Sequence, residues 1–221
     1  MSIFEKPLFI YEIANNHQGN VERGTRIIRE MRKVSEPYRD RFDFAIKFQY
    51  RNLDTFIHPD YQDRDDIKNV KRFKDTRLDS GQFAELLQEV REDGFYAICT
   101  PFDEPSVDLI MAHGYDVIKI ASCSFTDWRL LEKIARQGKP VIASGAGSSF
   151  EDVEKVVHFF RNRGIDFSLM HCVAEYPVAS TSLQMNQIDF YKRHFENLRI
   201  GFSTHEAPDN IEPIKIAVAK G

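Results

Sequence analysis

Residues 138–171, GKPVIASGAGSSFEDVEKVVHFFRNRGIDFSLMH, contain one complete strand–helix–strand repeat. The apolar runs at 140–144 and 167–171 have the length of buried strands, and the first contains the β-branched residues Val141 and Ile142. Between them, apolar residues recur at the i, i+3, i+4, i+7 spacing of an amphipathic helix: Val153, Val156, Val157 and Phe160. The stretch therefore predicts one unit of a parallel sheet whose strands are joined by helices.

The same rhythm extends outward over the whole chain. A second helical pattern is formed by Phe83, Leu86, Leu87 and Val90. Glycines stand where helix C-caps are expected before strands, at Gly94, Gly114, Gly138 and Gly164. Seven strands are predicted: Leu8–Ile13, Phe44–Phe48, Tyr96–Cys99, Val117–Ala121, Pro140–Ser144, Phe167–His171 and Arg199–Ser203.

Seven strand–helix units are one fewer than a (β/α)8 TIM barrel needs to close. We therefore interpret residues 1–221 as a single, incomplete TIM-barrel domain that lacks its eighth strand after the helix at 210–220. An open, doubly wound sheet is the alternative, but it would leave two unpaired edges. The stretch 51–79 is the long irregular interruption of the rhythm, and it reads either as an active-site loop or as a solvated insertion.

Composition narrows the class of protein. The apolar fraction of 42% and the formal charge of −4 favour a globular protein with a sizeable core and argue against a nucleic-acid binder. No apolar run has the length of a membrane span and no signal peptide is recognisable, so a cytoplasmic location without membrane contact is expected. Cys99, Cys123 and Cys172 fit no zinc motif and are interpreted as reduced core residues.

Polar residues stand at almost every strand end, where barrel enzymes place their active sites. Lys47 and Lys119 are the most informative, because a lysine inside an apolar strand needs an anionic partner. A substrate phosphate or carboxylate in one common cavity is the favoured partner of both. An internal salt bridge from one lysine to Glu12 is an equally good reading for that lysine alone.

Hydroxyls and histidines complete the strand ends. Ser122, Ser144 and Ser203 are candidate phosphate donors, although single serines are more often caps or turn residues. His205 follows its strand by two residues and is expected to face the cavity, whereas His171 lies within a strand and is expected to be a hydrogen-bonded core residue.

Several short motifs resemble, in order, those of the sialic acid synthase family. The most specific is the run Glu12–Gly19, EIANNHQG, which is similar to the family's opening Glu-Ile-Gly-x-Asn-His-x-Gly. It is followed by KFQ at 47–49, TPF at 100–102, KIAS at 119–122, KPVI at 139–142, HC at 171–172 and EYP at 175–177.

The resemblance implies an enzyme that condenses phosphoenolpyruvate with an N-acetylated amino sugar aldehyde, giving a nonulosonic acid and phosphate. It implies Glu12, Lys47, Lys119 and His205 as catalytic residues. It assigns Lys47, Thr100, Lys119, Ser122, Ser144 and Ser203 to the phosphoenolpyruvate anions. Glu12, Gln49 and Tyr176 would contact the sugar, and Phe102 belongs to the same substrate-binding set.

The family also uses Mn²⁺ or Mg²⁺ to polarise the aldehyde, and His205 matches one of its two histidine ligands. The second histidine would lie on the eighth strand, and the family's C-terminal antifreeze-like domain is expected to be absent. Family members form domain-swapped dimers, so a homodimer is one expected state, but without the swapped domain the oligomeric state stays open.

Three positions depart from the family pattern: Ser124 replaces a glutamate, Ala174 an asparagine or serine, and Thr204 an aspartate. They motivate a second hypothesis, a non-catalytic relative that binds an acidic or phosphorylated sugar ligand. A third hypothesis is an aldolase in which Lys119 forms a Schiff base, because a desolvated lysine can act as a nucleophile.

Overall fold

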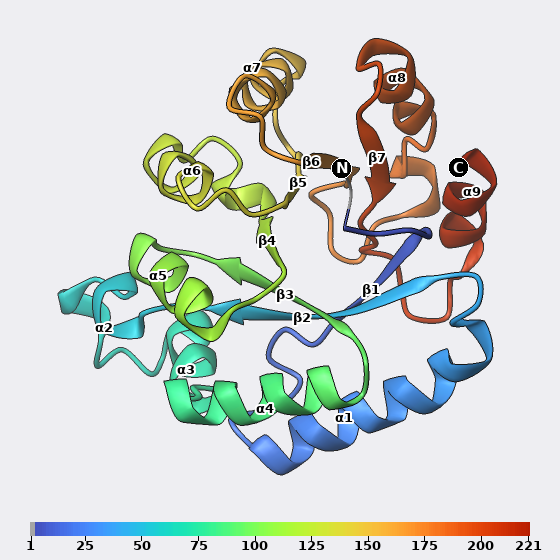
Figure 1. Ribbon diagram of the computed structural model, residues 1–221. Coiled ribbons are helices and arrows are strands. Elements are labelled where there is room, and N and C mark those ends of the chain that lie inside the picture. Colours follow the sequence, from blue (N-terminus) through green and yellow to red (C-terminus); the bar gives the residue numbers. More distant parts are fainter. Residues whose placement is uncertain (1–2) are drawn as a thin grey trace. The chain divides into compact units, whose positions relative to one another are not determined.

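The computed structural model describes residues 3–221, which divide after Ile118 into two compact units. Every described strand pair within each unit is parallel. The α/β class predicted from the repeat is therefore confirmed. Figure 1 shows helices alternating with strands along both units.

The first unit is built on adjacent parallel strands in chain order. β1 (Leu8–Glu12) pairs with β2 (Asp43–Tyr50), β2 with β3 (Tyr96–Pro101), and β3 with the start of β4 (Val117–Ile120). Its helices are α1 (Val21–Ser35), α2 (Leu53–Phe56), α3 (Lys68–Asp75), α4 (Ser80–Glu92) and α5 (Glu104–His113), with 3-10 turns η1 (Glu36–Tyr38) and η2 (Pro59–Tyr61).

Local sequence explains where these helices begin and end. Helix α4 starts at a capping box, in which the Asp79 side chain accepts from the Gln82 backbone N–H and the Gln82 side chain accepts from the Asp79 backbone N–H. Helix α5 is capped by Asp103 and ends at Gly114, whose φ of 75° lies in the left-handed region. Helices α1 and α4 lie side by side in Figure 1, and α4 buries the predicted apolar stripe.

The second unit contains the stretch that predicted the fold. β5 (Val141–Ser144) pairs with β6 (Phe167–His171), and β6 pairs with β7 (Arg199–Phe202). Its helices are α6 (Trp128–Ala135), α7 (Phe150–Arg161), α8 (Asn186–His194) and α9 (Glu212–Lys220), with 3-10 turns η3 (Ser122–Ser124) and η4 (Ser180–Ser182). Helix α7 buries Val153, Val156, Val157 and Phe160, as its spacing predicted.

Two predictions are wrong in detail. The stretch 51–79 is only partly irregular, because it forms α2, η2 and α3 and encloses its own apolar cluster of Leu53, Ile57 and Val70. Cys123 is exposed rather than in the core, since its strand ends three residues earlier and η3 turns its side chain outward. Cys99 and Cys172 are buried, and all three thiols are free.

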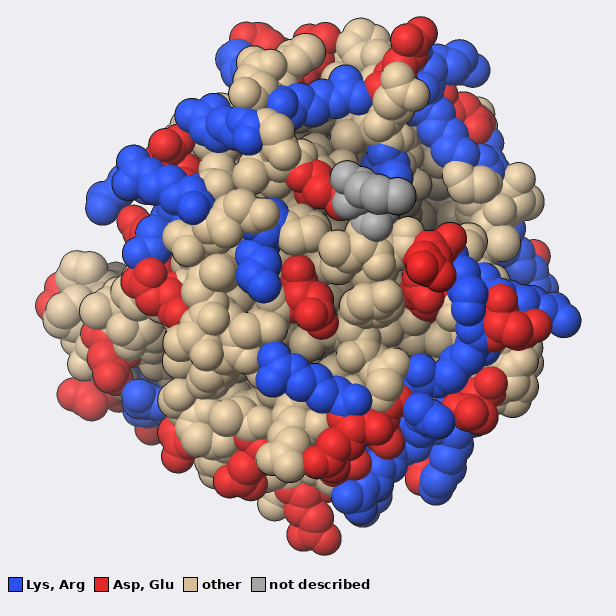
Figure 2. All heavy atoms as spheres, viewed as in Figure 1, with Lys and Arg blue, Asp and Glu red and all other residues tan. Residues whose placement is uncertain are grey.

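The surface carries charges of both signs. Figure 2 shows Lys and Arg side chains interspersed with Asp and Glu over the face in view, without a field of one sign. Among the described residues, no helix combines the length and the apolar character that crossing a membrane requires.

Candidate functional site

In the first unit, the predicted site residues stand on three adjacent strands. The parallel register places Glu12 beside Lys47, and Gln49 beside Thr100. Because side chains alternate along a strand, Lys47 and Gln49 share one face of β2, while Phe48 and Tyr50 occupy the other face and pack against Phe83 of α4. The alternation therefore keeps the polar residues off the helix-covered side.

Lys47 forms an ion pair with Glu12, and its side chain is only 12% exposed. The internal salt bridge is thus the reading that the structure supports for this lysine. The expectation that a ligand anion alone neutralises Lys47 is wrong, because the neighbouring strand supplies a carboxylate at the matching register position.

Thr100 lies at the carboxyl end of β3 and is 1% exposed. Its hydroxyl oxygen has no hydrogen-bond partner among the residues that the structure describes. A buried hydroxyl without a partner is unfavourable by about 1–3 kcal/mol. A ligand atom or a water molecule that accepts from or donates to this hydroxyl would remove that cost.

Arg51 is a site residue that the sequence reasoning missed. Its guanidinium donates from Nη2 to Gln49 Oε1 at 2.8 Å and lies over the Phe102 ring, with Cζ 3.8 Å from the centroid. Phe73 of α3 contacts the same guanidinium at 4.7 Å. The sequence offered no signal beyond an arginine two residues after Gln49, because Phe73 and Phe102 are distant in the chain.

In the second unit, Lys119 is buried and donates from Nζ to Ser144 Oγ at 2.7 Å and to the carbonyl oxygen of Ile120 at 2.8 Å. Burial lowers the pKa of Lys119 to about 8. The two predicted residues are therefore in direct contact. Both hydrogen-bond partners are neutral, so neither supplies a negative charge to the ammonium. A bound anion would supply that charge.

Cys172 and His205 form a second polar pair in this unit. The thiol sulfur lies 3.7 Å from both ring nitrogens, and His205 Nδ1 lies 2.8 Å from the carbonyl oxygen of Val173. The hydrogen bond with Cys172 raises the pKa of His205. Burial acts to raise the pKa of Cys172, but His205, Ser203 and Lys119 outweigh it and leave that pKa below its usual value.

The remaining predicted residues of the second unit are spread along the strand ends. Tyr176 is 84% exposed, with its ring 4.9 Å from that of His205. The backbone N–H of Ser203 donates to the carbonyl oxygen of His171, and Ser122 begins η3. His171 is buried and its Nε2 lies 2.8 Å from the carbonyl oxygen of Leu183, so the prediction of a hydrogen-bonded core histidine is confirmed.

The residues present fit only part of a metal site. His205 can donate its Nδ1 proton to Val173, which would leave Nε2 as a ligand, an arrangement common in metal proteins. However, residues 3–221 contain no group of three or more His, Cys, Asp or Glu side chains placed to hold a metal ion. A divalent ion at His205 would need further ligands from elsewhere or from water.

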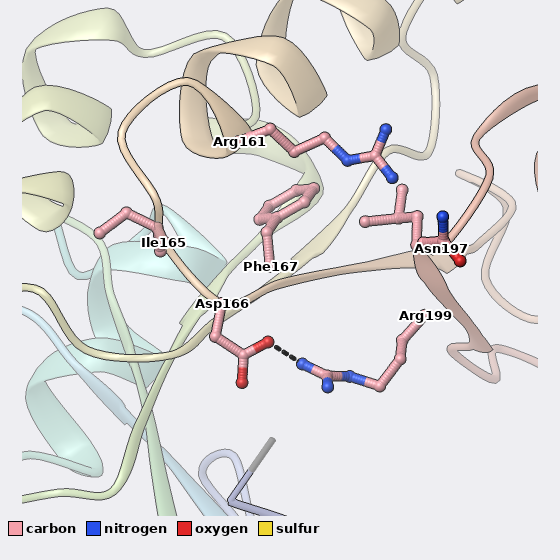
Figure 3. Close-up of a pocket in the computed structure, with 7 residues that line it drawn as sticks. Arg161, Ile165, Asp166, Phe167, Asn197 and Arg199 are labelled. Atoms are coloured by element: carbon pink, nitrogen blue, oxygen red, sulfur yellow. Dashed lines mark hydrogen bonds and ion pairs between the residues drawn. The ribbon is translucent and has the colours of Figure 1, made fainter. Parts of the chain in front are cut away.

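A pocket of about 170 Å³ in the second unit lies away from these strand ends (Figure 3). It is found at the amino ends of β6 and β7, where Arg199 forms an ion pair with Asp166. Its lining comprises Arg161, Ile165, Asp166, Phe167, Asn197, Leu198 and Arg199. None of the predicted site residues lines it.

Two of the solved structures that are similar to this chain have descriptions that name proteins of polysaccharide or sialic acid biosynthesis. A Chromobacterium violaceum protein described as spore coat polysaccharide biosynthesis protein E is 57% identical, with a TM-score of 0.94 over 98% of this chain and 64% of that one. The N-acetylneuraminic acid synthetase of Leptospira borgpetersenii, solved in complex with citrate, is 29% identical, with a TM-score of 0.84 over 98% and 70%.

Among curated proteins, the N-acetylneuraminate-9-phosphate synthase of Drosophila melanogaster is 29% identical over 205 residues, covering 89% of this chain and 53% of that protein. The chain spans about half the length of the first curated relatives it matches, 56% and 53%. The model of the NeuB family matches residues 42–221, which is most of the chain. This protein therefore belongs to the NeuB family, whose members among its relatives include sialic acid synthases.

Proposed function

We propose that this chain carries the phosphoenolpyruvate-binding part of a nonulosonic acid synthase, a transferase that condenses phosphoenolpyruvate with an N-acetylated amino sugar aldehyde. The observation that carries the proposal is the buried Lys119 ammonium, which contacts Ser144 at the carboxyl ends of β4 and β5 in a member of the NeuB family. A buried cation with only neutral hydrogen-bond partners favours an anionic ligand.

The fold belongs to the proposal as well. The seven strands of residues 3–221 follow the order of strand–helix units in a TIM barrel, and we propose that they are seven of the eight units of a closed (β/α)8 barrel. In that architecture the strand ends that carry Glu12, Lys47, Lys119 and Ser144 form the catalytic face.

The proposed reaction consumes one water molecule. Carbon C3 of phosphoenolpyruvate bonds to the aldehyde carbon, whose oxygen takes up a proton, while an oxocarbenium ion develops at C2. Water adds to C2 and loses a proton, and the resulting intermediate releases inorganic phosphate by cleavage of the C2–O bond. The products are a 2-keto sugar acid and phosphate.

Within this scheme the roles of the side chains follow from their chemistry. Lys119, Ser122, Ser144 and Ser203 donate to the phosphate or carboxylate of phosphoenolpyruvate, as does the buried Thr100 hydroxyl. Lys47, which is paired with Glu12, is included in this set on the family resemblance of the KFQ motif at 47–49. Gln49, Phe102, Tyr176 and Glu12 contact the sugar.

A divalent ion, Mn²⁺ or Mg²⁺, also belongs to the proposal, with His205 as one ligand. Such an ion would act as a Lewis acid. The described residues do not complete its site, so no step above is assigned to it.

The relatives suggest which sugars to test. Removing the three carbons of pyruvate from N-acetylneuraminate leaves N-acetylmannosamine, and the 9-phosphate product of the Drosophila relative would derive from the 6-phosphate of that sugar. Another relative is described as an N,N'-diacetyllegionaminic acid synthase, so a diacetylated amino sugar is the third substrate to test.

The test is to mix the protein with phosphoenolpyruvate, Mn²⁺ and each of these sugars, and to measure phosphate release together with the mass of the sugar acid. Phosphoenolpyruvate labelled with ¹⁸O at the bridging position should give labelled phosphate, because the C–O bond breaks. The Lys119→Met variant should lose the activity. Absence of phosphate release with all of these sugars would contradict the proposal.

Two other functions make different predictions. Ser124, Ala174 and Thr204 favour a non-catalytic relative, which would bind phosphoenolpyruvate in calorimetry without turnover. The lowered pKa of Lys119 favours a Schiff-base aldolase, in which borohydride would trap a carbonyl substrate on that residue. Turnover without a trapped adduct excludes both.

A further inference from the structure

Arg51 joins two residues that the proposed function places at the sugar. Its Nη2 donates to Gln49 Oε1 at 2.8 Å, and its guanidinium covers one face of the Phe102 ring at 3.8 Å from the centroid. All three side chains are partly buried, so the contacts form in a partly desolvated environment where they are stronger than in water.

The guanidinium restricts how Gln49 can present its amide. Arginine only donates hydrogen bonds, so it must face the amide oxygen and not the amide nitrogen. A flip of the amide would set N–H groups against N–H groups. The NH₂ end of Gln49 therefore points away from Arg51.

Packing from the 51–79 segment holds Arg51 in place. Phe73 of α3 contacts the guanidinium at 4.7 Å, and Phe56 of α2 packs edge-on against both Phe73 and Phe102 at 5.9 and 6.3 Å. The next residue, Asn52, donates its backbone N–H to Asp103 Oδ2 at 2.7 Å, which ties the start of the segment to the N-cap of α5.

We propose that Arg51 is a positioning residue that selects the sugar: it orients Gln49 so that the amide NH₂ donates to an acceptor oxygen of the substrate, and it fixes the Phe102 ring as an apolar wall. This inference rests on the proposed function and adds to it the kind of group that Gln49 recognises, a carbonyl or hydroxyl oxygen.

The first test compares Arg51→Met and Arg51→Lys with Arg72→Met. Arg72 belongs to the same segment, and its guanidinium lies over the Phe73 ring at 5.3 Å from the centroid. Its removal therefore takes away a cation from the same aromatic ring without removing the hydrogen bond to Gln49. Arg51→Met should raise the KM for the sugar about tenfold or more and leave the KM for phosphoenolpyruvate unchanged. Arg51→Lys should recover part of the loss, and Arg72→Met should match the wild type.

The second test is Gln49→Glu, which keeps an oxygen for Arg51 but replaces the NH₂ donor with an acceptor. Sugar affinity should fall at least tenfold although thermal stability is retained. A wild-type sugar KM for Gln49→Glu or for Arg51→Met overturns the inference.

Failure of the proposed function gives a different experimental result from failure of the role of Arg51. A wild type that releases no phosphate contradicts the synthase proposal, and binding of N-acetylmannosamine by calorimetry then decides the role of Arg51. Weaker binding by Arg51→Met than by Arg72→Met supports that role. Equal binding by the two variants, or no binding by the wild type, overturns it.

Discussion

At the scale of single residues, two strand lysines of similar sequence context find different partners. Lys47 meets the Glu12 carboxylate at a matching position of the neighbouring strand, whereas Lys119 has the Ser144 hydroxyl and a backbone carbonyl oxygen. Only the second arrangement leaves a buried ammonium with neutral hydrogen-bond partners, and burial lowers its pKa to about 8. Lys119 is therefore the better marker of an anion site.

This difference predicts a pH dependence of ligand binding. A bound anion favours the charged form of Lys119, so above pH 8 binding must take up a proton, and the affinity for phosphoenolpyruvate should fall by up to tenfold per pH unit. Calorimetry between pH 7 and 9.5 measures the affinity. Lys119→Arg, which stays charged, should show little change across this range.

Proton uptake checks the same prediction without a variant. At pH 9 the heat of binding should differ between buffers of different ionisation enthalpy, because up to one proton is taken up for each ligand bound. Equal heats in all buffers, with an affinity that does not change with pH, would contradict a titrating Lys119.

At the scale of elements, the 51–79 segment is a small folded structure at the end of β2. Leu53, Ile57 and Val70 form its apolar cluster, with Ile67 and Phe73 packed against it. Each of the three buried residues is 8–9% exposed, so the cluster is smaller and more exposed to solvent than the main core. It places Phe73 against Arg51 and so links the packing of α3 to the candidate site.

Removing part of this cluster should open the segment before the rest of the unit. We expect Leu53→Ala to lower the free energy of local unfolding of this segment by about 2 kcal/mol. This is the low end for a leucine truncation, because Leu53 is not fully buried. Hydrogen exchange should then speed up in 53–75 and stay slow in β2. The exposed Thr55→Ala on the same helix is the control, and equal acceleration in β2 would show that the segment does not open by itself.

At the scale of the whole molecule, we expect histidines to contribute to the change of stability in mild acid. Burial lowers the pKa of His17, His113 and His171, whereas contact with Cys172 raises that of His205. His17 and His113 belong to the first unit, where His113 also joins a hydrogen-bonded chain through Tyr50 to Tyr115. The second unit holds His171 and His205, whose shifts oppose each other.

The sign of the expected effect follows from linkage. A histidine whose folded pKa is lowered favours the neutral form, so the stability it contributes is present above pH 6.5 and is lost as the pH falls below it. Urea denaturation at pH 7.5 and 5.5 should give a lower free energy of unfolding at pH 5.5, by at most about 1.4 kcal/mol per pH unit for each histidine.

Substitution locates the source of that loss. His17→Gln should reduce the difference between the two pH values, while His158→Gln, on an exposed position of α7, should leave it unchanged. A difference that survives His17→Gln and His113→Gln would assign the acid response to other groups.

Much of the fold could be predicted from the sequence because its signals are local. Strand β6 was predicted at its observed bounds, and the other strands to within two residues at either end, since apolar runs and strand-ending polar residues mark them. The helix stripes of α4 and α7 were predicted for the same reason. The interior of 51–79 was missed because α2 is only four residues long and α3 is strongly charged.

The sequence alone determined the α/β class, the positions of the strands and the chemical nature of their polar ends, because these depend on periodicities of a few residues. The tertiary structure alone decided the pairing of Lys47 with Glu12, the contact of Lys119 with Ser144, the pairing of Cys172 with His205 and the stacking of Arg51 on Phe102. These partners are 25 to 51 residues apart in the chain, and strand register and helix packing, which no local pattern encodes, bring them together.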